Sequence, residues 1–300
     1  MTHPGFLTNA DLGKVSEELK KSLSHCTICP FKCGTDRYRE EGSRCRAGHL
    51  PKVASATLHH GEEPPISGTK GSGTIFFSSC GLRCLFCQNY PVSQMGNGNE
   101  MTVSQLAEAM LVLQRKKAHN INLVTPTHYT PQIVEALAVA KDMGLSIPIV
   151  YNSSGYERVE TLRLLDGIVD IYLPDMKYGT DEMALRYSGA VRYVEINRRA
   201  VSEMYRQTGP LRFDDEGIAT RGLLVRHLVL PGGISCTGEV LRWLSELSRD
   251  IPVSLMNQYF PAYRAFDMKD IGRKLRYNEY DYASRLLEKY GFSFGWTQEY

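Results

Sequence analysis

The sequence has no long apolar run, no excess of charge of one sign and no signal for export. None of its apolar stretches approaches the roughly 18 residues that span a bilayer, so we expect no membrane segment. Lys and Arg number 35 against 33 Asp and Glu, and a net charge of +2 gives no electrostatic reason to expect nucleic acid as a partner. The N-terminus lacks the basic and apolar regions of a secretory signal, so we expect a cytoplasmic protein.

Cysteine, by contrast, is concentrated in one part of the chain. Seven of the eight cysteines lie between Cys26 and Cys87, and only Cys236 lies outside that window. In a reducing compartment such clusters are metal ligands more often than disulfides. Cys236 has no neighbouring cysteine, and an isolated thiol of this kind is usually a small buried side chain.

The pattern of apolar residues predicts an α/β fold. Short apolar runs typical of buried strands alternate with segments of helical periodicity from residue 73 onward, in about six βα units. Six units are fewer than the eight of a full barrel, and they predict a partial (β/α)6 TIM-like barrel over residues 73–300, with an open doubly wound sheet as the alternative. Strands are expected at 74–78, 120–125, 147–151, 169–173, 223–230 and 253–256, and helices at 103–117, 131–143, 157–165, 181–194, 196–207, 239–248 and 277–290.

Residues 1–72 differ from the rest of the chain, because they are rich in Cys, Gly, His and charge and poor in apolar runs. We interpret them as an N-terminal cysteine-rich metal-binding cap with one short helix near 11–23. Such a segment buries too little apolar surface to be stable by itself, and we expect a metal to hold it together.

The second cysteine cluster, Cys80, Cys84 and Cys87, directly follows the first predicted strand of the barrel. Three thiolates within eight residues, without a fourth ligand nearby, do not match structural zinc, which takes four ligands. A [4Fe–4S] cluster held by three cysteines has one iron without a protein ligand. The carboxyl end of a barrel strand is also where such enzymes keep their chemistry.

The spacing Cys80-x3-Cys84-x2-Cys87, with Phe86 inside it, resembles the signature of the radical S-adenosylmethionine (SAM) superfamily. The surrounding sequence is similar to the branch that contains pyruvate formate-lyase activating enzyme. The resemblance implies a cluster that reductively cleaves SAM to methionine and a 5′-deoxyadenosyl radical, which then abstracts hydrogen from a substrate. It also implies SAM and a reductant such as flavodoxin or ferredoxin as partners.

The resemblance further implies a set of SAM contacts at the ends of successive strands. Two stretches depart from the family pattern: Thr125–His128 replaces a Gly-Gly-Glu stretch, and Asn257–Pro261 replaces a strand end that often bears His. Lys177 and Arg226 suit the SAM carboxylate, and Asp175 suits the ribose diol or a bound cation. The implied contacts are Phe86, Thr125, Thr127, Asn152, Ser153, Asp175, Lys177, Arg226 and Gln258.

The first cysteine cluster, Cys26-x2-Cys29-Pro30-x2-Cys33-x11-Cys45, supplies four thiolates. That number completes either a tetrahedral zinc site or a second [4Fe–4S] cluster, and the spacing slightly favours iron–sulfur. Because all its metal positions would carry protein ligands, we expect a structural or electron-relaying site.

Several functions remain open on the sequence alone. The radical would serve either to activate a glycyl-radical enzyme or to modify a peptide, an amino acid or a small metabolite directly. A function of another class is a non-enzymatic iron–sulfur electron carrier or a zinc-dependent binding protein. The polar run from His59 to Glu63 fits both a lid over the barrel mouth and a surface loop.

Overall fold

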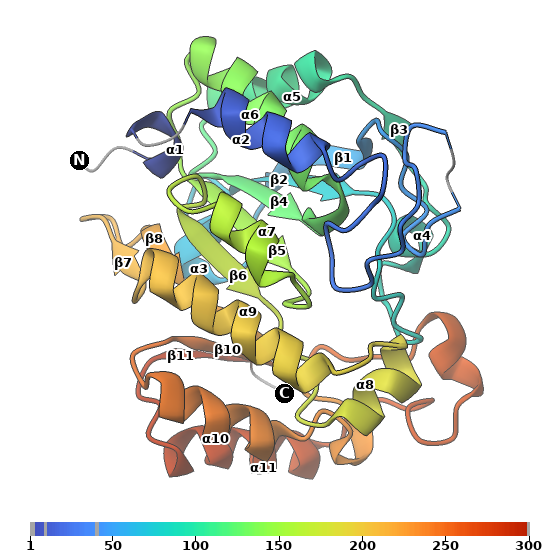
Figure 1. Ribbon diagram of the computed structural model, residues 1–300. Helices are drawn as coiled ribbons and strands as arrows, with labels where there is room; N and C mark the ends of the chain where they lie inside the picture. The colour runs from blue at the N-terminus through green and yellow to red at the C-terminus, as the bar shows by residue number, and fades with distance from the viewer. Residues whose placement is uncertain (1–3, 9–10, 40–41, 299–300) are drawn as a thin grey trace.

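The computed structural model describes residues 4–8, 11–39 and 42–298, and its centre is a mostly parallel sheet with helices packed around it (Figure 1). Four strands run parallel in chain order: β2 (Ser72–Phe77), β4 (Ile121–Val124), β5 (Ile149–Ser153) and β6 (Ile171–Pro174). Nearly all of their residues are buried, as expected for parallel strands covered on both faces. The α/β class is thereby confirmed.

A second group of parallel strands continues this order. It consists of β9 (Val225–Leu228), β10 (Val253–Met256) and β11 (Gly295–Thr297). A parallel bridge between Asp175 and Arg226 joins it to the end of β6, where the Met176 amide donates to the Arg226 carbonyl at 2.8 Å. Strand β8 (Ala219–Leu223), which directly precedes β9, pairs in parallel with β6. The order β2-β4-β5-β6, then β8 with β9, then β10 is the one that six successive βα units require.

Antiparallel strands at the edges were not predicted. The long strand β1 (Lys52–His59) pairs with β2, and β3 (Asn99–Glu100) pairs with β1. Because β1 belongs to the segment 1–72, the expectation of a loop-rich cap there was incomplete; its short Ala, Ser and Thr side chains weaken the apolar signal of a strand. The expected strand 223–230 is divided, since β8 (Ala219–Leu223) pairs with β7 (Arg212–Phe213) and β9 begins two residues later.

The helices agree with the predicted positions to within a few residues at most ends. Helix α5 (Val103–Arg115) begins with the capping box of Thr102 and Gln105. The expected helix 181–194 is shorter, because Gly189 adopts a left-handed φ of 59° that ends it. The remaining helices are α1 (Gly5–Thr8), α2 (Leu12–Lys20), α3 (Pro64–Ser67), α4 (Tyr90–Ser93), α6 (Thr130–Asp142), α7 (Val159–Leu164), α8 (Asp181–Ser188), α9 (Tyr193–Thr208), α10 (Thr237–Leu247) and α11 (Tyr277–Lys289).

Hydrogen bonds hold the N-terminal cysteine segment against the elements that follow the parallel strands. The fully buried Arg37 donates to the carbonyls of Ala47 and Gly48 and, across the chain, to that of His128. Arg158 at the start of α7 donates to the Thr27 carbonyl at 2.8 Å. The loop therefore has a fixed position relative to the strand ends. In the part of the chain described above, no helix is long and apolar enough to cross a membrane.

Candidate active site

A cavity of about 380 Å³ lies at the carboxyl ends of the parallel strands, a size typical of small-molecule sites. The loop that follows β2 forms one side of it and brings Cys80, Cys84 and Cys87 to the same cavity. Phe86 also lines it and is buried edge-on against Tyr259. The structure therefore brings the three predicted thiols together at the strand ends.

The surroundings of these thiols suit thiolate ligands. The Ser188 hydroxyl donates to Cys84 Sγ at 3.0 Å, and Ser93 Oγ lies 3.1 Å from Cys87 Sγ. Burial raises the pKa of Cys84 to about 12, and the neighbouring thiols add to this effect, while Lys177 opposes it. A bound cationic metal group would reverse that balance, because coordination deprotonates thiols. Over the residues described, no three His, Cys, Asp or Glu side chains lie in an arrangement that could hold a metal ion, so the fit rests on the chemistry of the three thiols.

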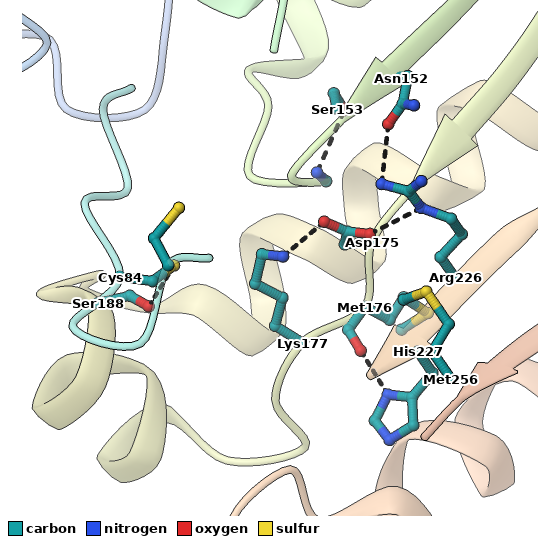
Figure 2. A network of polar contacts seen from close by, with 12 residues as sticks. Cys84, Asn152, Ser153, Asp175, Met176, Lys177, Ser188, Arg226, His227 and Met256 are labelled. Atoms are coloured by element: carbon teal, nitrogen blue, oxygen red, sulfur yellow. Dashed lines mark hydrogen bonds and ion pairs between the residues drawn. The ribbon is translucent and has the colours of Figure 1, made fainter. Parts of the chain in front are cut away.

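A buried network of polar contacts centred on Arg226 forms the opposite side of the cavity (Figure 2). Arg226 Nε donates to Asp175 Oδ1 at 3.1 Å, and its terminal nitrogens donate to Asn152 Oδ1 at 3.0 Å and to Glu62 Oε2 at 3.3 Å. Lys177 Nζ lies 2.5 Å from Asp175 Oδ2. Burial by itself would raise the pKa of Asp175, but Lys177 and Arg226 hold it below its usual value. Asp175 is therefore a carboxylate.

His227, the neighbour of Arg226 on β9, fixes the segment that carries Asp175 and Lys177. Its Nδ1 lies 2.5 Å from the Met176 carbonyl and must donate to it, so Nε2 accepts from the Thr237 hydroxyl at 2.9 Å. Burial lowers the pKa of His227 to about 4, which keeps the ring neutral. A neutral histidine with both nitrogens bonded is a positioning group for this strand end.

Glu62 is a site residue that the sequence analysis did not select. Its Oε1 accepts from Asn122 Nδ2 at 3.1 Å, and its Oε2 accepts from Arg226. Burial raises the pKa of Glu62, and Arg226 opposes that shift. The pairing of β1 with β2 places His59 opposite Ser72, at the amino end of β2. Glu62 therefore enters from the end opposite the cysteine loop and forms the floor of the cavity, rather than a lid or a surface loop.

The other predicted contacts have different positions. Thr125, Ser153 and Gln258 line the cavity together with the network residues, and Gln258 lies exposed at its mouth. Thr127 is absent from this lining, since its hydroxyl donates to Glu157 Oε1 at 2.6 Å. The structure therefore brings together every predicted SAM contact except Thr127.

The two cysteine clusters are neighbours in space. Cys29 and Cys45 from the N-terminal segment and Cys80 from the second cluster line one small cavity of about 20 Å³, which has room for a single water molecule. Burial raises the pKa of Cys29 to about 12, whereas Cys33 is exposed. The fastening of the N-terminal loop described above thus sets its thiols beside the second cluster.

The buried carboxyl of Glu157, which lies between Thr127 and the N-terminal cysteines, makes protein stability depend on pH. Burial raises its pKa from 4.5 to about 7, so its stabilising effect is complete below pH 4.5 and is lost as pH rises through 7. Between pH 5 and pH 8 we expect this effect to lower the free energy of unfolding of wild type by up to about 3 kcal/mol, and we expect Glu157→Gln to lack it. Urea unfolding at the two pH values measures the difference. The exposed Glu160→Gln serves as control and should keep the wild-type profile; equal profiles in both variants would contradict the assignment.

A thiol-lined cavity at the carboxyl ends of six parallel strands is the architecture of the radical SAM superfamily, and the sequence profile of that superfamily matches residues 74–212. The chain belongs to this superfamily. It is 32% identical over 281 residues to an uncharacterized protein of Methanocaldococcus jannaschii, covering 91% of this chain and 77% of that protein. Membership indicates an enzyme and implies an iron–sulfur cluster, SAM and an external reductant.

Proposed function

We propose that this protein reductively cleaves SAM in the cavity between the cysteine loop and the Arg226 network, and that the resulting 5′-deoxyadenosyl radical abstracts hydrogen from a substrate. The observation that carries the proposal is the meeting of three thiols with four largely buried charged side chains in one cavity. Cys80, Cys84 and Cys87 would hold the [4Fe–4S] cluster. When bound, that cluster supplies one electron to the sulfonium of SAM.

The polar network suggests how the chain's own residues receive SAM. Arg226 gives three of its five N–H donors to Glu62, Asp175 and Asn152, so it orients these side chains and keeps two donors for a ligand. The Lys177 ammonium has three donors and gives one to Asp175, which leaves it suited to the SAM carboxylate. Both cations thus keep donors that suit the SAM carboxylate. Phe86 presents its ring to the cavity and suits contact with the adenine.

The size of the cavity bears on the substrate. A volume of about 380 Å³ matches one small ligand, so SAM would occupy most of it. The reacting part of a substrate would then enter at the mouth, where Gln88 Nε2 donates to the Gln258 carbonyl at 2.8 Å. This geometry favours a projecting segment of a protein or peptide, as in activation of a glycyl-radical enzyme. Direct modification of an amino acid or small metabolite is the alternative.

We further propose that Cys26, Cys29, Cys33 and Cys45 hold a second [4Fe–4S] cluster or a zinc ion. Their place beside Cys80, across a cavity large enough for one water, supports a relay or structural role close to the SAM site. Seven to eight irons per chain, roughly, would indicate two clusters, and about four irons with one zinc would indicate one.

The test is SAM cleavage by the anaerobically reconstituted protein. With SAM and a low-potential reductant, we expect 5′-deoxyadenosine and methionine in equal amounts, measured by chromatography, together with bound iron and sulfide. Bound iron that is reduced without any SAM cleavage would indicate an electron carrier instead. Zinc without iron would indicate a zinc-dependent binding protein.

A further inference from the structure

A groove of about 440 Å³ lies on the outer side of the cysteine loop, opposite the candidate active site. Residues of the loop alternate between the two spaces: Cys84 and Phe86 line the active-site cavity, whereas Arg83 and Leu85 line the groove. Gln94, whose amide donates to the Cys84 carbonyl at 3.4 Å, lines both. A wall one residue thick therefore separates the groove from the three thiols.

The groove carries a strong positive charge. Four arginines line it, and no acidic side chain does so among the residues described. One acid, Asp270, pairs with Arg186 at 2.6 Å from outside the lining. The four arginines are Arg44, Arg83, Arg186 and Arg264.

These arginines differ in their hydrogen-bond, ring and ion-pair partners. Arg44 donates to the carbonyls of Gly81 and Ser188 and so supports the cysteine loop. Arg83 has a left-handed φ of 53°, a conformation that a glycine would adopt at lower cost. Arg264 is exposed and stacks over the ring of Tyr263. Among the described residues, neither Arg83 nor Arg264 has an acidic partner in an ion pair, so their charge is available to a bound molecule.

The floor of the groove is rigid. The Leu85 amide donates to the Tyr187 carbonyl at the end of α8, and the Leu85 carbonyl accepts from the Arg264 amide. Apolar surface borders the charge, since Leu185 on α8 is 56% exposed. Charged side chains around an apolar contact on a rigid backbone are typical of a surface that binds a protein with the opposite charge.

We propose that this groove is the docking site for the acidic electron-carrier protein that reduces the enzyme. The inference rests on the proposed function, because it needs an iron–sulfur cluster on Cys80, Cys84 and Cys87. Because the groove is positively charged, it suits an acidic partner. Because the cysteine loop alone separates the groove from the three thiols, the redox group of a bound partner would lie directly across the loop from the cluster. With a flavin donor, one electron passes inward and the anionic hydroquinone becomes the neutral semiquinone, without transfer of a proton.

The test compares Arg264→Glu with Arg212→Glu, a reversal at an exposed arginine on β7. Strand β7 lies across the molecule from α8, the helix whose residues line the groove (Figure 1). For Arg264→Glu, we expect the second-order rate of cluster reduction by flavodoxin hydroquinone at low salt to fall about 10-fold or more. The affinity for oxidised flavodoxin, measured by calorimetry, should weaken with it. Raising NaCl should slow wild type toward the variant and change the variant little. The Arg212→Glu control should match wild type throughout.

Photoreduced 5-deazariboflavin, a small neutral reductant, should reduce the cluster equally in all three proteins and so show that Arg264→Glu is intact. The double variant Arg83→Gln/Arg264→Gln provides a second test without charge reversal and should show the same loss. Wild-type binding and reduction by flavodoxin in these variants would overturn the proposal. So would tight binding of inorganic phosphate in the groove without any effect on flavodoxin. A protein that holds no iron would refute the proposed function instead, because no reductant would then give a signal.

Discussion

Cys84→Ala should form 5′-deoxyadenosine at least about 100-fold more slowly than wild type. Removal of a residue that only supports a metal ligand usually costs less than this. Cys84 is the most deeply buried of the three thiols in the second cluster, and it accepts a hydrogen bond from Ser188. Alanine keeps the backbone but removes one of the three proposed ligands, and a cluster held by the remaining two should be lost. Iron content should fall by about four atoms per chain, measured together with the product.

The matched control for this experiment is Cys236→Ala. Cys236 lies at the start of α10, in a different part of the chain from both clusters, and its thiol makes long contacts to the Thr180 hydroxyl at 3.9 Å and to the Ile234 carbonyl at 3.7 Å. Iron content and SAM cleavage should therefore equal those of wild type. Full SAM cleavage by Cys84→Ala would contradict the proposed function.

Arg226→Met should destabilise the protein by about 3 to 5 kcal/mol at pH 8, because it leaves Glu62 and Asp175 buried without their shared partner. Arg226 keeps only 19% of its side chain exposed, and the two carboxylates keep 8% and 12%. Without the guanidinium, burial raises the pKa of Glu62 further, whereas Lys177 still lies beside Asp175 and opposes such a shift there. The loss should therefore be smaller at pH 5, where Glu62 takes up a proton, and urea unfolding at the two pH values measures it.

A surface ion pair supplies the comparison for Arg226. Arg242 is 48% exposed and contacts Glu239 and Glu246 at 2.8 and 3.0 Å. Arg242→Met should leave the free energy of unfolding close to that of wild type, since solvent screens such pairs. Adding Glu62→Gln to Arg226→Met should restore part of the stability by removing one buried charge. Equal small losses in both single variants would show that the network is not strongly coupled.

The local features of this fold could be predicted because they depend on neighbouring residues. Apolar periodicity located the parallel strands β2, β4, β5, β6, β9 and β10 but not β11, and the Thr102 cap located the start of α5. The edge strand β1 was missed because its small side chains carry little apolar signal. The end of α8 was misplaced because Gly189 lies inside a segment whose periodicity continues past it.

The residues of the candidate site also fall into those that the sequence could predict and those that it could not. Strand order predicted that Asn152, Asp175 and Arg226 lie together, since the carboxyl ends of parallel strands meet at one edge. Thr127 also follows a strand, yet its hydroxyl bonds Glu157 and it lies outside the cavity. The direction of a single side chain depends on the turn that carries it and on its partners, which periodicity does not report.

By itself, the sequence determined the α/β class, the two cysteine clusters and the superfamily, because each depends on residue types at fixed local spacing. Only the tertiary structure decided that Glu62 forms the cavity floor and pairs with Arg226, 164 residues further along the chain. It also decided that the two cysteine clusters line one small cavity. A groove lined by arginines lies on the outer side of the loop that carries the second cluster. Contacts of this kind arise from packing between distant segments, and charge balance in a buried site becomes visible only when all its partners are in place.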